Sequence, residues 1–321
     1  MSQDRSSNDS QSHNIAATDE RHTGRLWGMS LSTLIAALIT VLSWSSAFVG
    51  IRAGLEAYSP THVALFRYII TSIVLAVYMA LTGRRLPAWR DWPGIAVTGL
   101  FGITYYNLAL NYGQVVVPSA TASFLIASAP VWLALLASFI FRERLQIWGW
   151  IGIGISMAGV AVIALGNAGQ LSFAPRALVV LSAAFATSIY SLGQKKYVAE
   201  YGALSCTAYA IWAGTLFLLP FGGGLFSETL AAPFSATAAV IYIGLVPGAI
   251  GYVTWSYVLG QVPAARAGSF LYLVPALALL VAWLWLGEVP SGVSVIGGIL
   301  VLAGVIVVNR LGKVQQASRN A

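Results

Sequence analysis

Ten hydrophobic stretches of about 20 residues follow one another along this chain, and they constrain its fold more than any other feature. A helix of about 20 apolar residues crosses the ~30 Å hydrocarbon layer of a bilayer. The predicted spans are 31–51, 60–81, 92–113, 118–141, 147–166, 175–195, 203–222, 234–257, 263–286 and 290–309. Their connections are too short to hold a soluble domain. We therefore predict an all-α integral membrane protein with ten transmembrane helices.

The sequence offers little material for catalysis or cofactor binding. Charged residues make up only 8% of the chain, against about 25% in soluble proteins. A single cysteine, Cys206, excludes a disulfide framework within one chain, and the three histidines lie outside the interiors of the predicted spans. No nucleophile–base pair, acid pair or metal-ligand set is placed inside the membrane. We expect no enzyme activity, no metal and no cofactor.

An internal duplication sets the architecture. Residues 118–143 recur as 263–288, so that the starting prolines, the central Pro130 and Pro275 and the closing glutamates are each 145 residues apart. Aligned without gaps, residues 118–165 are identical to residues 263–310 at 13 of 48 positions. Five spans per copy is an odd number, so the second copy enters the membrane from the opposite side. This predicts two inverted five-helix repeats related by a pseudo-two-fold axis in the membrane plane.

These boundaries give four predicted parts. Residues 1–25 are polar without apolar periodicity and are expected to form a disordered cytoplasmic tail. The first repeat covers 31–166, the second covers 175–309, and 310–321 form a second cytoplasmic tail.

The basic residues predict the orientation. With the N-terminus inside, cytoplasmic segments hold 14 of the 17 lysines and arginines. These are Arg5, Arg21, Arg25, Arg84, Arg85, Arg90, Arg142, Arg144, Lys195, Lys196, Arg266, Arg310, Lys313 and Arg319. Both termini are therefore expected in the cytoplasm. We expect the protein to lie in the inner membrane of the cell. The net charge of +7 is explained as a topology signal, so no nucleic-acid partner is expected.

Prolines inside the spans predict kinks. In hydrocarbon, the carbonyl that a mid-helix proline leaves without an N–H partner must find another donor. Pro130 and Pro275 should release carbonyls near Ile126 and Leu271. The kinks either flex at a substrate site or are static and satisfied by a neighbouring Ser or Thr. Pro247 is equivalent to Gly102 across the 145-residue period, so the third and eighth spans should also be weakened.

Polar and aromatic residues within spans are candidates for the wall of a watery cavity, with interhelical hydrogen bonding as the alternative. Asn107 and Asn111 lie one helical turn apart, and Tyr252 and Trp255 share a helix face. The candidate substrate-binding residues are Trp44, Phe48, Asn107, Asn111, Ser128, Tyr190, Tyr252, Trp255, Ser269 and Tyr272. Small residues in the fifth and tenth spans, at Gly152, Ser156, Gly159, Gly297 and Gly304, instead predict close helix packing.

Arg67 is the one basic residue predicted well inside a span, roughly 10 Å along the helix from Pro60. It either attracts a substrate carboxylate or phosphate, or serves structure by snorkelling or pairing with Glu56. Arg52 is a second, more superficial candidate. No Asp or Glu occupies a span centre. Glu143 and Glu288 are expected to cap helix N-termini at tight turns.

The chain resembles the EamA-like ten-helix transporters of the drug/metabolite transporter superfamily. The resemblance rests on LSWSSAFVGIRAGLEAYSP in the first span, LFRY in the second, and the duplicated segments with PSATAS, FRERLQ and AGV. It covers about residues 31–310. It implies a basket-like fold with a central cavity lined by spans 1, 3, 4, 6, 8 and 9, and export or uptake of small metabolites such as amino acids. Related four-span multidrug exporters use a first-span glutamate, which is missing here.

We therefore expect a secondary transporter that exports small organic metabolites, foremost amino acids or related amphipathic solutes, by alternating access. One alternative is an organic-anion or sugar-phosphate-like exchanger that uses Arg67 and Arg52. An alternative of another class is a non-transporting membrane scaffold or binding protein. The expected partners are a small-molecule substrate and the lipid bilayer, with the protein a monomer or weak oligomer.

Overall fold

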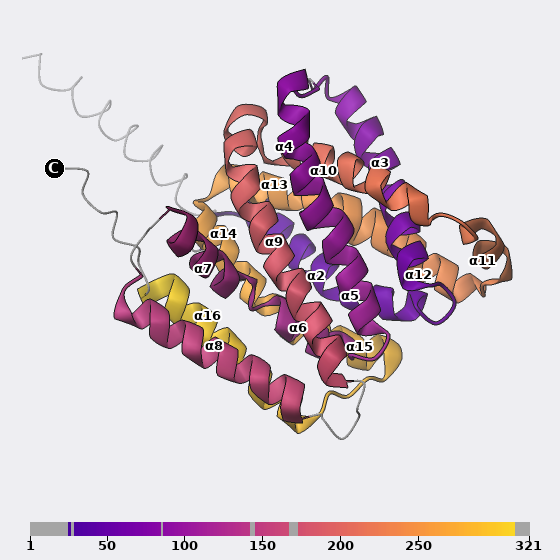
Figure 1. The fold of residues 1–321 in the computed structure, drawn as a ribbon. Helices are drawn as coiled ribbons and strands as arrows, with labels where there is room; N and C mark the ends of the chain where they lie inside the picture. The colour runs from indigo at the N-terminus through magenta and orange to yellow at the C-terminus, as the bar shows by residue number, and fades with distance from the viewer. Residues whose placement is uncertain (1–24, 27–28, 85, 142–144, 167–172, 312–321) are drawn as a thin grey trace, which may run out of the picture.

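The computed structural model describes residues 25–26, 29–84, 86–141, 145–166 and 173–311 (Figure 1). The predicted tails therefore lie almost wholly outside the described residues, as does Glu143. The first half contains β1 (Arg25–Leu26), β2 (Met29–Ser30), α2 (Leu31–Gly54), α3 (Pro60–Leu81), η1 (Trp89–Asp91), α4 (Trp92–Gly99), η2 (Leu100–Tyr105), α5 (Tyr106–Gln114), α6 (Ser119–Ile126), α7 (Ala129–Phe141) and α8 (Ile147–Gly166). The second half contains α9 (Phe173–Tyr201), α10 (Ala203–Leu218), η3 (Leu219–Phe221), α11 (Leu225–Ala231), α12 (Phe234–Leu245), η4 (Val246–Ile250), α13 (Gly251–Gln261), α14 (Ala264–Phe270), η5 (Leu271–Leu273), α15 (Val274–Leu286) and α16 (Gly292–Leu311).

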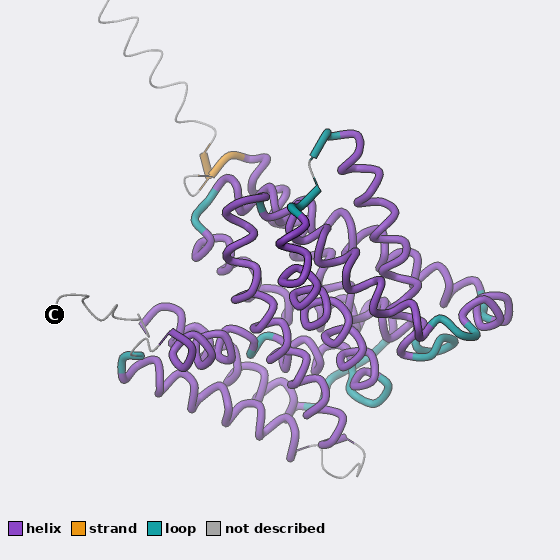
Figure 2. Tube along the Cα trace, turned by 45° about the horizontal axis from the view of Figure 1, so that its top comes forward, coloured by secondary structure: helices purple, strands orange, loops and turns teal. Residues whose placement is uncertain are grey.

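The fold is all-α, as predicted. Helices joined by short loops make up the described chain, and the strands β1 and β2 form only a small antiparallel pair before the first long helix (Figure 2). Among the described residues, nine helical segments are long and apolar enough to cross a membrane. The remaining predicted span consists of α4, η2 and α5, with 8, 6 and 9 residues in unbroken succession. Its length suits a tenth span, and its tyrosines and asparagines explain its lower hydropathy.

The predicted spans are shorter than some of the helices. α9 continues to Tyr201, beyond the predicted end at residue 195, because Lys195 and Lys196 end the apolar run but not the helical hydrogen bonding. The helix stops at Gly202, whose φ of 80° lies in the left-handed region that glycine adopts at little cost. Hydropathy therefore locates the membrane segment, while the helix ends where the backbone changes conformation.

The two repeats meet along their last helices. α8 and α16 lie side by side at the lower edge of the molecule (Figure 1). A Cβ atom added to Gly159 of α8 would lie 2.6 Å from the carbonyl oxygen of Gly297 in α16, so the two backbones are in contact. This confirms the packing role predicted for the small residues of both spans.

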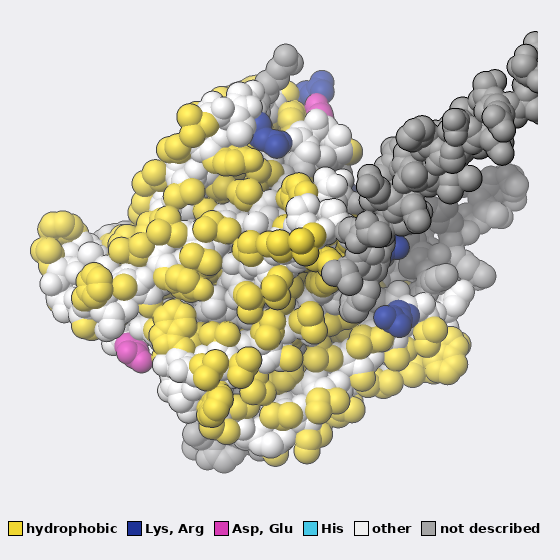
Figure 3. Space-filling view, turned by 180° about the vertical axis from the view of Figure 1, so that it is seen from behind, with side chains coloured by type: hydrophobic (Ala, Val, Ile, Leu, Met, Phe, Trp, Pro, Cys, Tyr) yellow, Lys and Arg dark blue, Asp and Glu magenta, His cyan; other side chains and the backbone are white. Residues whose placement is uncertain are grey.

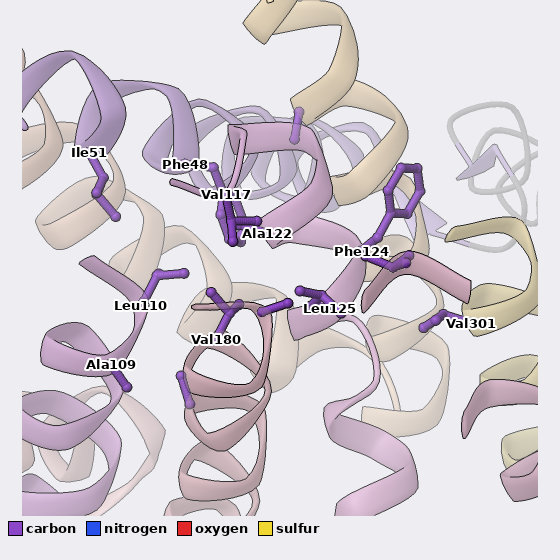
Figure 4. Packing of buried hydrophobic residues seen from close by; sticks show 14 of the residues in the cluster. Phe48, Ile51, Ala109, Leu110, Val117, Ala122, Phe124, Leu125, Val180 and Val301 are labelled. Atoms are coloured by element: carbon purple, nitrogen blue, oxygen red, sulfur yellow. The ribbon is translucent and has the colours of Figure 1, made fainter. Parts of the chain in front are cut away.

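The largest hydrophobic cluster joins both repeats. Phe48 from α2, Leu110 from α5, Leu125 from α6 and Val180 from α9 approach one another, with Val301 of α16 near Phe124 (Figure 4). The same cluster also contains buried residues of the second, fifth, eighth and ninth spans, so most of the spans share this interior.

The outer surface matches a lipid environment. Large apolar side chains such as Phe139, Phe234 and Leu81 are more than four-fifths exposed. Apolar side chains cover most of the face in Figure 3, where the charged groups are few and isolated. A continuous exposed apolar surface of this extent would be unfavourable in water and is favourable in hydrocarbon. The protein is a multi-pass membrane protein.

Candidate substrate site

A row of buried amides on α5 joins three helices. Asn107, Asn111 and Gln114 are each at most 1% exposed. Asn107 Nδ2 donates to the Tyr68 hydroxyl and the Ile103 carbonyl, Asn111 Nδ2 to the Pro60 carbonyl, and Gln114 Nε2 to the Phe48 carbonyl. The donor sides of all three amides are thus used in packing, as the hydrogen-bonding alternative expects. The oxygens of Asn111 and Gln114 accept no hydrogen bond from any described residue.

Arg67 is buried beside this row. Its side chain is 6% exposed, and its Nη1 donates to the Asn107 Oδ1 at 3.3 Å. The guanidinium carbon lies 5.1 Å from the centre of the Tyr68 ring. The predicted pairing of Arg67 with Glu56 is wrong, because no carboxylate of the described chain lies within ion-pair distance of Arg67. The Arg67 Nε has no hydrogen-bond partner among the described residues.

The first and eighth spans contribute a group of aromatic rings. The Trp44 ring lies 5.5 Å from the Tyr252 ring and 5.4 Å from the Trp255 ring, measured between centroids. All three side chains are half-buried. Tyr252 also packs against the hydrophobic cluster that contains Tyr68, the residue beside Arg67. We call Trp44, Arg67, Asn107, Tyr190, Tyr252 and Trp255 the central cluster.

Helix irregularities bring these side chains together. η2 and η4 are π-helical turns at positions related by the 145-residue period, as predicted for Gly102 and Pro247. π-Helical turns inside α-helices are frequent at functional sites. A Cβ atom on Gly102 would lie 2.3 Å from the Tyr190 ring, and one on Gly251 would lie 2.8 Å from Trp44 Nε1. The missing side chains therefore let both aromatic rings approach the irregular backbone.

The prolines predicted to kink the fourth and ninth spans do so. Pro130 and Pro275 are the second residues of α7 and α15. Before Pro130, α6 ends at Ile126. Before Pro275, α14 ends and the 3₁₀ turn η5 continues to Leu273. The Ser188 hydroxyl donates to the Ala129 carbonyl at 2.9 Å. The Ser45 hydroxyl donates to the Val274 carbonyl at 3.1 Å.

Ala129 and Val274 are equivalent in the two repeats. A serine from the first helix of each repeat therefore bonds to the kink of the other repeat. The carbonyls that accept from the serines lie immediately before the prolines. The Leu271 carbonyl, predicted to be released, accepts instead from the Val274 N–H in the 3₁₀ turn.

Other predicted residues lie outside the central cluster. Phe48 belongs to the hydrophobic core. The Ser128 and Ser269 hydroxyls donate to carbonyls of their own segments, and the Tyr272 hydroxyl accepts from Asn309 Nδ2. Two members of the polar network were missed by sequence reasoning, Tyr68 and Gln114. Tyr68 follows Arg67 directly, and Gln114 continues the helical spacing of Asn107 and Asn111. The sequence pattern could therefore have identified both residues.

Known proteins resemble the chain over almost its entire length. It is 42% identical over 294 residues to a protein of Streptantibioticus cattleyicolor named "Probable terminal-alkyne amino-acid exporter", covering 90% of this chain and 98% of that one. It is 39% identical to the uncharacterized transporter YdfC of Bacillus subtilis, covering 89% and 94%. A Salmonella typhimurium protein named "Probable amino-acid metabolite efflux pump" is 24% identical, covering 87% and 95%.

A solved crystal structure has the same fold. It superposes with a TM-score of 0.59 at 22% sequence identity, over 88% of this chain and 97% of that one. The EamA-like transporter family matches residues 31–165 and again residues 175–310. The two matches coincide with the two halves that the helix pairing and the repeated irregularities define. This chain belongs to the EamA-like transporter family.

Proposed function

We propose that this protein exports amino acids or related small amphipathic solutes across the inner membrane by alternating access, with both termini in the cytoplasm. The names of two relatives concern amino acids, and the central cluster has complementary chemistry. A zwitterion needs a cation for its carboxylate and, where acids are lacking, an electron-rich face for its ammonium group. Arg67 offers the first, and the rings of Trp44, Tyr252 and Trp255 offer the second.

One observation carries the proposal. Arg67 is buried with no carboxylate partner in the described chain and with an unpartnered Nε. A buried arginine without a counter-charge is costly in a membrane. Its two described interactions, with Asn107 and the Tyr68 ring, are directed to neutral groups. A substrate carboxylate would supply the missing charge.

The kinked helices support transport over a static binding role. Turns interrupt the fourth and ninth spans at equivalent depth, and π-helical turns interrupt the third and eighth. Paired interruptions in inverted repeats are typical of transporters whose halves move against each other. A non-transporting scaffold has no need for them, and the family is one of transporters.

The same arginine supports a second candidate, exchange of organic anions or sugar phosphates. The two candidates differ in the role of the aromatic group. A phosphate or dicarboxylate would depend on Arg67 but gain little from Trp44 and Trp255, whereas an amino acid would depend on both.

Counterflow in proteoliposomes tests the proposal. Vesicles preloaded with a mixture of amino acids should accumulate a labelled member of the same class in the absence of an ion gradient. Arg67→Gln should abolish this uptake, while Arg84→Gln, at a cytoplasmic loop, should leave it intact. Accumulation of labelled organic anions without any accumulation of amino acids would favour the second candidate.

A further inference from the structure

Two half-helices that are equivalent in the repeats differ in burial. α6 and α14 are related by the 145-residue period. Every residue from 119 to 125 in α6 is at most 4% exposed. In α14, Ala267 is buried, whereas Arg266 and Ser269 are exposed. An arginine and a serine on an exposed surface are favoured by water and not by hydrocarbon.

Their packing differs in the same way. α6 packs against α2, α5, α9, α15 and α16, whereas the described part of α14 contacts α2 and α13 to a small extent. In an inverted repeat, equivalent elements lie at opposite membrane faces. With the N-terminus in the cytoplasm, α6 is at the outer face and α14 at the inner face. The outer half is therefore closely packed at α6, whereas the inner half leaves Arg266 and Ser269 of α14 exposed.

Polar contacts join the segments at the closed face. Arg52, in the last turn of α2, donates through Nη1 to the Gln114 carbonyl at 2.6 Å and the Val115 carbonyl at 2.7 Å. Its Nε lies 3.4 Å from Oε1 of Glu288, which follows α15. The other oxygen, Glu288 Oε2, accepts from the backbone N–H of Ser119, the first residue of α6, at 3.0 Å.

This arrangement links three segments of the chain. Arg52 belongs to the first span, residues 114–119 connect the third and fourth, and Glu288 ends the ninth. Glu288 accepts from α6 across the repeat boundary. Charge-assisted hydrogen bonds are stronger than neutral ones, but these side chains are 34% and 19% exposed, so solvent screening reduces their strength. A contact of intermediate strength that joins both repeats suits a reversible closure.

We propose that this conformation is open toward the cytoplasm, and that Arg52 and Glu288 with the Ser119 N–H form an outer gate that breaks when the protein opens outward. The inference rests on the alternating access and orientation proposed above. The residues position the spans and do not contact the substrate. Removing either side chain shifts the population toward the outward-open state, because the contacts exist only in the closed one.

Thiol accessibility tests the gate without any substrate. In a chain with Cys206→Ser, Thr121→Cys reports on buried α6 and Ser269→Cys reports on exposed α14. A membrane-impermeant maleimide should label position 269 rapidly from the cytoplasmic face and position 121 only slowly from the outer face. Glu288→Gln should raise labelling of position 121 from the outer face by about tenfold and lower labelling of position 269. Arg52→Gln should act in the same direction.

The matched control is Glu56→Gln, which removes an exposed carboxylate near the end of the same first span. It should change neither labelling rate. A variant that merely unfolds would gain labelling at both positions, whereas gate opening gives opposite changes. Labelling of position 121 at the control rate in both gate variants would overturn the proposal. Because no substrate is used, this result is independent of whether amino acids are transported.

Discussion

Gly152 of α8 lies against the backbone of Gly304 of α16, where a Cβ atom would sit 2.7 Å from the Gly304 carbonyl oxygen. Gly159 and Gly297 make the corresponding contact at a second point along the same two helices. Gly152 is equivalent to Gly297, and Gly159 to Gly304, so each contact is the image of the other under exchange of the repeats. The numbering also shows that the helices are antiparallel. A self-complementary contact of this kind is expected on a two-fold axis.

Gly152→Ala should therefore destabilise the protein. The added methyl group would lie 2.8 Å from Val308 N as well as close to the Gly304 oxygen, so the helices must separate. We expect a loss of about 1–3 kcal/mol, as for other overpacked sites. The measurement is the thermal unfolding midpoint in detergent.

Gly154→Ala is the matched control. Gly154 is on the same helix, and nothing lies within 4 Å of the position its Cβ would take. Alanine favours helix over glycine by up to about 1 kcal/mol, so this variant should be neutral or slightly stabilised. Equal destabilisation by both substitutions would contradict the role assigned to the α8–α16 contact.

The serines at the kinks should affect the balance between access states. Ser45→Ala and Ser188→Ala each remove a hydroxyl that bonds to a kink carbonyl of the other repeat. Hydrogen bonds between membrane helices contribute about 0.6 kcal/mol on average and up to about 1.7. We expect transport rates to change by about three- to twentyfold, with normal membrane insertion, when counterflow is measured.

Ser191→Ala is suited to be the control for these serines. The Ser191 hydroxyl donates to Thr187 of its own helix and crosses no repeat boundary. Its loss should leave the transport rate unchanged. If all three substitutions behave alike, the kink contacts have no special part in transport.

Much of this fold could be predicted because the membrane imposes a simple rule on sequence. Apolar length located the spans, and the spacing of Pro130 and Pro275 located the kinks. The partners of Arg67 could not be predicted, because they depend on how α3 and α5 are rotated against each other. Asn107, forty residues away in sequence, is brought beside Arg67 by that rotation. Glu56, though close in sequence, is exposed at the end of the first helix.

The ion pair between Arg52 and Glu288 was also beyond sequence reasoning. Glu288 was expected to cap a helix, which it does, but the helix it caps is α6 in the other repeat. A capping pattern in sequence identifies a local helix start and cannot reveal a distant one. The inverted topology brings these segments together only after both repeats have folded.

The aromatic side of the central cluster predicts a substrate-dependent effect. Trp44→Ala should raise the KM for amino acids by about two- to thirtyfold, because a cation–π contact contributes about 0.5–2 kcal/mol. Concentration-dependent counterflow measures this. Trp283→Ala is the control, because Trp283 is 56% exposed on α15. An unchanged KM in the Trp44 variant would remove the aromatic group from the site.

The environment of Asp91, in η1 between α3 and α4, predicts how the stability of the protein changes with pH. A hydrogen bond from the Tyr201 hydroxyl, at 2.6 Å, and the nearby Lys196 ammonium lower the pKa of the Asp91 carboxyl below its usual 3.8. The ionised carboxylate ties η1 to the end of α9. Because the folded pKa is the lower one, this stabilisation is present above about pH 3.8 and is lost as the pH falls through the folded value.

Asp91→Asn should therefore lower the thermal midpoint at pH 7, and the difference from the unmodified protein should shrink as the pH falls below about 3.8. Tyr201→Phe should show the same dependence in weaker form, since Lys196 still faces the carboxylate. Glu56→Gln removes a carboxylate that has no ion-pair partner in the described chain and should leave the midpoint unchanged at both pH values. A midpoint difference for Asp91→Asn that persists undiminished in acid would show that packing, and not the ionised carboxylate, is responsible.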